Sequence, residues 1–313
     1  MIETSASAPA KVILLGEHAV VYDKPSIAVP VSSLRAQVKI TQNPDEQHIK
    51  IKAANQDIQD IVITPDKFHM DEPLVFAIRV FLEQFGLPFR GMDIFLDSQI
   101  PVASGLGSGA AVSTALFRSL ASIFEVNIEA AQLNNLVYAV EKLHHGTPSG
   151  IDNTVIVYEK PVYFQRSQPI ERLEIAAPFT LLIADTGEKA LTRKAVNDVR
   201  HLFITNNLKT GLILDEIGSI VVTAKTCIET GDFKTLGGLM TQNHELLKSL
   251  NVSSDSLNRL VKTALNHGAL GAKLSGGGQG GNMIALIDVG SLPKVKKELI
   301  ASGAVRVIQT TIS

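Results

Sequence analysis

The sequence predicts an α+β protein that folds as two domains. Its 313 residues are long for a single hydrophobic core and sufficient for two. Most of the first half consists of short segments with the apolar alternation of strands, whereas most of the second half has helical periodicity. The pattern changes near Pro169 and Pro178, so we expect one domain over residues 1–175 and another over residues 176–313.

The first domain is expected to combine strands with a few helices. Five segments have apolar residues that alternate or run together as in strands: residues 7–15, 29–40, 49–51, 61–63 and 92–96. Apolar residues at three- and four-residue spacing predict three helices, over residues 74–85, 110–121 and 128–143. A hairpin is expected from two further apolar segments, residues 155–158 and 162–164.

The second domain is expected to be richer in long helices. Helical spacing of apolar residues occurs in five segments: residues 195–202, 213–227, 233–250, 255–266 and 293–300. Three apolar segments predict strands: residues 179–184, 283–287 and 305–312.

The composition excludes several classes of partner and site. With 29 basic and 31 acidic residues the net charge is −2, which provides no general field for nucleic acid or an anionic membrane. No stretch reaches the length of a transmembrane helix. Cys227 is the only cysteine, so an internal disulfide or a cysteine-based zinc site is excluded. We therefore expect a cytoplasmic protein without nucleic-acid or membrane partners.

A glycine-rich loop joins the strand at residues 92–96 to the following helix. It consists of Pro101, Val102, Ala103, Ser104, Gly105, Leu106, Gly107, Ser108, Gly109, Ala110 and Ala111. Glycines let the backbone approach a ligand, and a helix start offers unpaired N–H donors, so this loop is suited to phosphate. Taken alone, it fits an ordinary turn before a helix equally well. It matches neither the P-loop nor the dinucleotide-binding pattern.

Two carboxylates near the middle of the chain suit phosphoryl transfer. Glu141 closes a predicted helix, and Asp152 follows in a Pro-Ser-Gly turn. Phosphoryl transfer requires a metal held by few protein oxygens and a carboxylate that accepts the proton of the attacking hydroxyl. Glu141 could serve as a magnesium ligand and Asp152 as the base, with Lys11 favouring the ionised form of Asp152. The alternative for Asp152 is a capping or turn residue.

These segments together resemble the three signature motifs of the GHMP kinases, the family of galacto-, homoserine, mevalonate and phosphomevalonate kinases. The first motif is Lys11-Val12-Ile13-Leu14-Leu15-Gly16-Glu17-His18, and the second is the glycine-rich loop. The third is a second glycine cluster, Gly276 to Gly281, which follows Lys273. The string His145-Gly146-Thr147-Pro148-Ser149-Gly150-Ile151-Asp152-Asn153 resembles members that phosphorylate mevalonate. The motifs occur in the family order over nearly the whole chain.

The resemblance implies a fold, a reaction and a set of site residues. The N-terminal domain would be of the ribosomal protein S5 domain 2 type and the C-terminal domain ferredoxin-like. The reaction would be ATP- and Mg²⁺-dependent phosphorylation of the mevalonate 5-hydroxyl, in a homodimer. The loop at residues 101–111 would bind ATP, and Glu141 would be the metal ligand. Asp152 would be the base, with Lys11 as its partner. The residues that contact the substrate would be Lys11, Glu17, His18, Asp152 and Thr192.

Three positions depart from the family pattern. Gly109 stands where the family has a serine that binds magnesium, so Ser108 or a water molecule is expected to take that place. Ala190 replaces an arginine of the substrate segment, and Asn282 replaces a cysteine, which we interpret as a change in packing.

Two alternative functions remain open on the sequence. A related kinase could act on phosphomevalonate or on the 3-hydroxyl of mevalonate, although the carboxylate of Glu17 is an unfavourable neighbour for a second phosphate. A non-catalytic sensor that kept the kinase fold is favoured only by Gly109. Lys11, Glu141 and Asp152 weigh against it, because a sensor needs neither base nor metal ligand.

Overall fold

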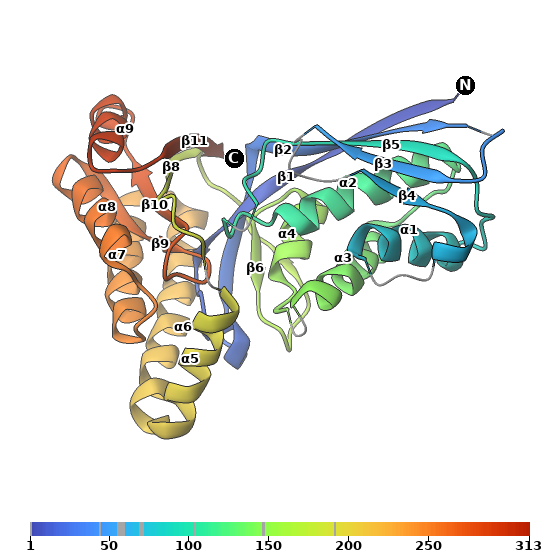
Figure 1. Cartoon of the computed structure of the whole chain (residues 1–313). Helices are drawn as coiled ribbons and strands as arrows, with labels where there is room; N and C mark the ends of the chain where they lie inside the picture. The colour runs from blue at the N-terminus through green and yellow to red at the C-terminus, as the bar shows by residue number, and fades with distance from the viewer. Residues whose placement is uncertain are drawn as a thin grey trace. The chain divides into compact units, whose positions relative to one another are not determined.

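The computed structural model describes the chain except residues 1, 44, 55–59, 69–71, 103, 146–147 and 191. The chain forms two compact units (Figure 1), and each is assembled from several stretches. The first unit contains residues 1–10, 34–101 and 107–159, and the second contains residues 11–33, 102–106 and 160–313. The sequence predicts two consecutive domains instead, residues 1–175 and 176–313, and that division stays a prediction.

The first unit is a sheet covered by helices. Its strands are residues 3–10 of β1 (Glu3–Leu15), residues 34–42 of β2 (Ser26–Gln42), β3 (Ile49–Ala53), β4 (Ile61–Ile63) and β5 (Met92–Ser98). Its helices are the 3₁₀ turn η2 (Pro65–Lys67), α1 (Pro73–Gln84), α2 (Ser108–Ile123), α3 (Ala130–His145) and α4 (Ile151–Tyr158). The strand order is β4-β3-β5-β2, with β3 parallel to β5 and the other neighbours antiparallel.

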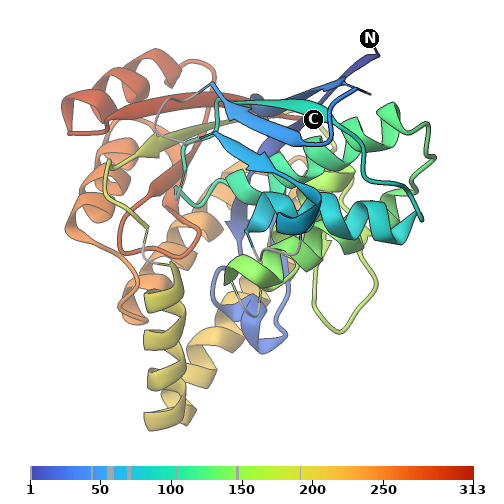
Figure 2. The ribbon, with the colours of Figure 1, turned by 45° about the vertical axis from the view of Figure 1, so that its right-hand side comes forward.

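Alternation along the strands decides which face of this sheet the helices cover. On β2 the side chains of Val38 and Ile40 are buried and those of Gln37 and Lys39 are exposed. Because successive side chains point to opposite faces, the apolar ones form a single buried face. Helices α1 to α4 lie along one face of the sheet in both Figure 1 and Figure 2. The strands and helices predicted for residues 29–143 are confirmed, with ends displaced by a few residues.

Helix α4 corrects one prediction. Residues 155–158 are three β-branched residues and a tyrosine, which suggest the first strand of a hairpin, but they belong to a helix that begins after Gly150. Gly150 has a φ of 93°, a conformation that favours glycine, and Thr154 Oγ1 donates to the Gly150 carbonyl oxygen at 2.7 Å. Six of the eight residues are buried, so tertiary packing outweighs local strand propensity. Asp152 consequently lies in the first turn of a helix.

The second unit is built on a four-stranded antiparallel sheet of order β11-β8-β10-β9. Its strands are β8 (Phe179–Asp185), β9 (Ala269–Ser275), β10 (Asn282–Ile287) and β11 (Arg306–Ile312), and residues 26–28 of β2 pair with β6 (Val162–Phe164), which pairs with β7 (Glu171–Arg172). Its helices are the 3₁₀ turn η1 (Ala19–Tyr22), α5 (Thr192–Thr205), α6 (Asn207–Thr230), α7 (Phe233–Ser249), α8 (Asp255–Asn266) and α9 (Leu292–Ala301).

The core of the second unit lies where α7 and α8 pack on this sheet. Leu247 of α7, Leu257 and Leu260 of α8, and Leu182 and Leu274 of the strands belong to one buried apolar cluster. The five helices predicted for this part of the chain are confirmed. Among the residues that the structure describes, no helix is long and apolar enough to cross a membrane.

Helix α7 contacts strand β9 backbone to backbone, at Gly237 and Gly271. A Cβ at residue 271 would lie 1.9 Å from the Gly237 carbonyl oxygen, whereas a Cβ at Gly238 would meet nothing within 4 Å. Gly271→Ala is therefore expected to lower the free energy of unfolding by about 2–3 kcal/mol through overpacking. Gly238→Ala should raise it by about 0.5–1 kcal/mol, because alanine favours the helix. Urea unfolding of both variants checks the contact, and equal effects would contradict it.

Candidate active site

The glycine-rich loop changes from turn to helix at Gly107. Gly107 precedes α2 with a φ of 75°, and Gly105 has a φ of 79°, so both positions use the conformational freedom of glycine. Leu106 is buried and anchors the loop, whereas Val102 is 75% exposed. Residues 102–106 belong to the second unit and the helix start to the first. Of the predicted ATP-binding residues, Ala103 lies outside the described residues.

In the first unit, Glu141 lies beside the start of α2. Its side chain is buried, and a Cβ added at Gly109 would lie 3.1 Å from its Oε1 atom. The structure therefore brings together the two segments from which the sequence predicts metal ligands, Glu141 of α3 and Ser108 of α2. Any side chain at position 109 would contact the Glu141 carboxylate.

Asp152, the predicted base, is half-buried in the first turn of α4. Unpaired N–H groups at the start of a helix favour a negative side chain there. The neighbouring Asn153 donates from Nδ2 to Asn134 Oδ1 at 2.7 Å, which fixes the first turn of α4 to α3. Asp152 is thereby held on a helix and not on a loose turn.

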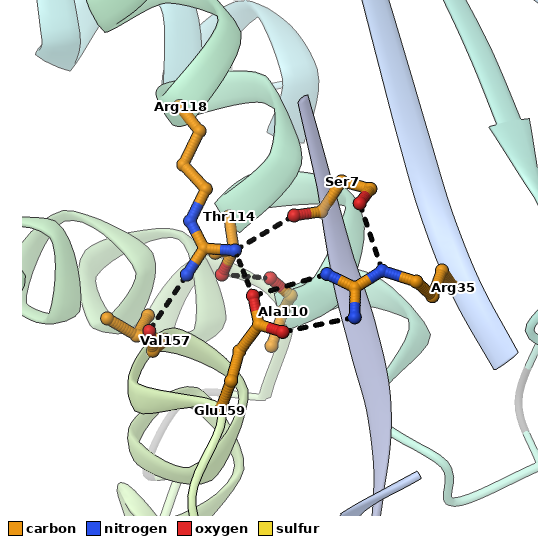
Figure 3. A network of polar contacts seen from close by, with 7 residues as sticks. All are labelled: Ser7, Arg35, Ala110, Thr114, Arg118, Val157 and Glu159. Carbon is orange, nitrogen blue, oxygen red and sulfur yellow. Dashed lines mark hydrogen bonds and ion pairs between the residues drawn. The ribbon is translucent and has the colours of Figure 1, made fainter. Parts of the chain in front are cut away.

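A network around Glu159 connects the far ends of α2 and α4 to the sheet (Figure 3). The Glu159 carboxylate accepts hydrogen bonds from Arg35 of β2 and Arg118 of α2, and Arg118 also donates to the carbonyl oxygens of Ser7 and Val157. Partial burial acts to raise the pKa of Glu159, but the bonds from both arginines outweigh it and hold this pKa below its usual value. The two helices that carry Ser108 and Asp152 are thus tied together.

In the second unit, the end of β1 leads into a buried polar turn. Lys11 is 2% exposed, and its backbone N–H donates to the Leu106 carbonyl oxygen of the glycine-rich loop at 3.0 Å. His18 is also buried, and its backbone φ of 62° lies in the left-handed region, which residues other than glycine rarely adopt. The first motif and the glycine-rich loop are therefore neighbours within this unit.

His18 has a defined hydrogen-bond polarity. Its Nε2 atom lies 3.0 Å from the Gly277 carbonyl oxygen. Burial lowers the pKa of His18 to about 4, so the ring is neutral near pH 7. Because a carbonyl oxygen only accepts, Nε2 carries the ring hydrogen and Nδ1 carries the lone pair. His18 can therefore accept a hydrogen bond at Nδ1, for example from a hydroxyl.

Thr192, the first residue of α5, meets the same glycine as His18. A Cβ at Gly277 would lie 2.7 Å from both Cα and Oγ1 of Thr192, so only glycine fits there. Two residues predicted to face the substrate, 174 positions apart in the chain, thus converge on one residue of the second glycine cluster.

The second glycine cluster supports the first. Asn282 Nδ2 donates to the Ser104 carbonyl oxygen at 2.6 Å, and a Cβ at Gly276 would lie 3.8 Å from Gly105 Cα. From the sequence, the exchange of cysteine for Asn282 is interpreted as a change in packing. In the structure, the Asn282 side chain also forms a hydrogen bond that holds the glycine-rich loop. Close backbone approach explains the concentration of glycine in this cluster.

The sequence does not predict the buried ion pair between Glu17 and Lys273. Glu17 is 1% and Lys273 0% exposed, and Lys273 Nζ donates to the Glu17 carboxylate. Burial raises the pKa of Glu17 and lowers that of Lys273, and the attraction between the two charges opposes both shifts. The signal in the sequence is a lone lysine within the apolar strand β9, since a buried charge requires a partner. The substrate role of Glu17 stays a prediction.

Comparison with known proteins identifies the family. The model of the GHMP kinases N terminal domain matches residues 73–160, and that of the GHMP kinases C terminal domain matches residues 224–305. A protein of Pyrococcus abyssi named mevalonate kinase is 35% identical over 298 residues, which cover 90% of this chain and 88% of the relative. The chain belongs to the GHMP kinase family.

Solved structures agree with this GHMP kinase fold. L. major mevalonate kinase in complex with R-mevalonate superposes with a TM-score of 0.86 at 27% identity, and the match covers 99% of this chain and 96% of that chain. Streptococcus pneumoniae phosphomevalonate kinase superposes with a TM-score of 0.80 over 99% of this chain and 100% of its own, but its 18% identity shows the fold alone. The predicted α+β fold of the GHMP kinases is confirmed.

Proposed function

We propose that this GHMP kinase transfers the γ-phosphoryl group of ATP to the 5-hydroxyl of mevalonate. The observation that carries the proposal is the 35% identity, over nine tenths of the chain, to a curated mevalonate kinase. The convergence of His18 and Thr192 on Gly277 supports it, because the structure groups residues predicted to face the substrate. We further propose that the enzyme is a cytoplasmic homodimer.

Asp152 is proposed to accept the proton of the 5-hydroxyl as its oxygen attacks the γ-phosphorus and ADP leaves. Lys11 is proposed as the partner of that carboxylate, as the resemblance implies. Most of the catalysis in phosphoryl transfer comes from positioning and charge stabilisation. The backbone N–H groups of the glycine-rich loop and the start of α2 are suited to steady the phosphates.

Magnesium fits the donor set beside α2. Mg²⁺ keeps several waters and is commonly held by one or two protein oxygens together with substrate phosphates. Glu141, buried next to position 109, and the Ser108 hydroxyl would hold the ion. When bound with ATP, Mg²⁺ neutralises developing charge on the phosphates.

The polarity of His18 suits a polyhydroxylated substrate. With Nε2–H committed to Gly277, Nδ1 would accept a hydrogen bond from a mevalonate hydroxyl and would repel its carboxylate. Thr192, exposed at the start of α5, would contribute a hydroxyl on the same side. His18 and Thr192 would thus orient the substrate through neutral hydrogen-bonding groups.

A coupled ADP-release assay tests the function. The protein is supplied with ATP, Mg²⁺ and, separately, mevalonate, 5-phosphomevalonate or homoserine. Turnover with mevalonate alone is expected. Turnover with only 5-phosphomevalonate would assign the protein to the related kinase, and binding of mevalonate without any turnover would favour the sensor.

Gly109→Ser is expected to strengthen metal binding. The new Cβ would lie 3.1 Å from Glu141 Oε1, which places a hydroxyl next to the proposed metal ligand. An added oxygen ligand should lower the Mg²⁺ concentration for half-maximal activity by about 5-fold. Titration with Mn²⁺, followed by electron paramagnetic resonance, measures the affinity without turnover. Gly109→Ala, which adds the Cβ without the hydroxyl, is the control, and equal metal affinity of the two variants would contradict the prediction.

A further inference from the structure

Three contacts join the first motif to the strand and loop that contain the second glycine cluster. Lys273 pairs with Glu17, Ser275 Oγ donates to the Ile13 carbonyl oxygen at 2.9 Å, and the Gly277 carbonyl oxygen accepts from His18. Lys273 and Ser275 are two residues apart on β9, so their side chains point to the same face of the strand, and Gly277 follows just after the strand ends. Segments more than 250 residues apart in the chain are therefore held in one register.

Lys273 makes two of the hydrogen bonds at this junction. Besides the Glu17 carboxylate, its Nζ atom donates to the Leu274 carbonyl oxygen at 2.6 Å, and its side chain is fully buried. The second carboxylate oxygen of Glu17, Oε2, has no hydrogen-bond partner among the described residues. Removal of Lys273 would thus leave a buried carboxylate without its ion-pair partner, so the Glu17 side chain would lose the contact that fixes its position.

A shift of Glu17 would reach His18 directly. Glu17 immediately precedes His18, whose left-handed backbone conformation allows little adjustment. Gly16, on the other side, has a φ of 97°, and its N–H lies 3.5 Å from Asn243 Oδ1, a long contact that restrains the turn weakly. The Glu17–Lys273 pair therefore restrains the residue next to His18, while the hydrogen bond to the Gly277 carbonyl oxygen restrains the His18 ring itself.

We propose that Lys273 is a positioning residue for substrate binding: by holding Glu17, it fixes His18 against Gly277 so that Nδ1 faces a hydroxyl of the bound substrate. The inference rests on the proposed function, because it presupposes that His18 contacts mevalonate. Glu17 then acts from within the protein as an internal counter-ion. The same arrangement explains why a charged pair occupies a site where apolar residues would pack as well.

The test is a double-mutant cycle with Glu17→Gln, Lys273→Met and the double variant, measured by ADP release and by urea unfolding. Each single variant is expected to raise KM for mevalonate about 10-fold, because a misplaced binding group loses its contact. KM for ATP should change less than about 3-fold. The double variant should recover stability relative to Lys273→Met, since no lone charge remains. The KM of the double variant for mevalonate should be about 10-fold above the parental value, as in each single variant. Independent effects would multiply to about 100-fold, which is not expected because Lys273 acts through Glu17.

A folded double variant with the parental KM for mevalonate would overturn the proposal, and so would multiplicative effects of the two single changes. Should the Lys273 variants fail to fold, Glu17→Gln alone carries the test, and an unchanged KM for mevalonate in that variant would overturn the proposal equally. The surface pair Lys24–Asp215 is the matched control, and Lys24→Met should leave both KM values unchanged. If the parent protein does not turn over mevalonate, the proposed function itself has failed.

Discussion

Asp152→Asn is expected to lower kcat with mevalonate by about 10²- to 10⁴-fold, the range that general bases contribute. Asparagine has nearly the same shape but cannot accept the proton of the attacking hydroxyl. The side chain lies in the first turn of α4, which Gly150 and the Asn134–Asn153 contact hold in place, so the fold should persist. KM for ATP and for mevalonate should remain within about 3-fold, because positioning by the other groups is retained.

The coupled ADP-release assay gives kcat, and circular dichroism verifies that the variant is folded. Asp255 offers a matched control, since it also lies in the first turn of a helix, α8, but is exposed. Asp255→Asn should leave kcat unchanged. If Asp152→Asn retained more than about a third of the parental kcat, Asp152 would not be the proton acceptor, and its position would reflect capping of α4 alone.

Candidate residues for the chemistry can be predicted from the sequence more readily than the packing. The glycine-rich loop, Glu141 and Asp152 stand out because phosphate binding and proton transfer demand particular residue types in short segments. The α+β class and most helices follow from periodicity, which is a local property. Residues 155–158 were predicted wrongly because a short β-branched segment has the same composition in a buried helix as in a strand.

The contacts that join distant segments could not be predicted. Lys273 and Glu17 are 256 residues apart, and no local pattern states which buried carboxylate a buried lysine meets. The hydrogen bond from Asn282 to Ser104 is similarly invisible, because the sequence shows only an amide where the family has a cysteine. Gly277 acquires its meaning only when Thr192 and His18 are seen on either side of it.

Mild acid is expected to destabilise the second unit through two buried histidines. Burial lowers the pKa of both His18 and His244 from 6.5 to about 4, and the charge of Lys273 adds to this effect on each. Between these values the unfolded chain binds more protons than the folded one, so stability is fully present above about pH 6.5 and is lost as the pH falls toward 4. The difference corresponds to about 3 kcal/mol of unfolding free energy for each imidazole.

His244→Asn isolates one of the two contributions. His244 Nδ1 accepts from the Leu274 backbone N–H at 3.3 Å, and the asparagine Oδ1 can take over that bond without binding a proton. Urea unfolding between pH 7.5 and 4.5 should therefore show a shallower loss of stability, with about one proton fewer taken up on unfolding near pH 5. Glu17 contributes with the opposite sign because burial raises its pKa, and the comparison with the parent removes that contribution. His201 is exposed, so His201→Asn should leave the pH dependence of the unfolding free energy unchanged. If His244→Asn showed the same pH dependence of stability as the parent, the pKa of His244 in the folded protein would not be lowered. Nδ1 would then carry a hydrogen in mild acid and could not accept from the Leu274 N–H.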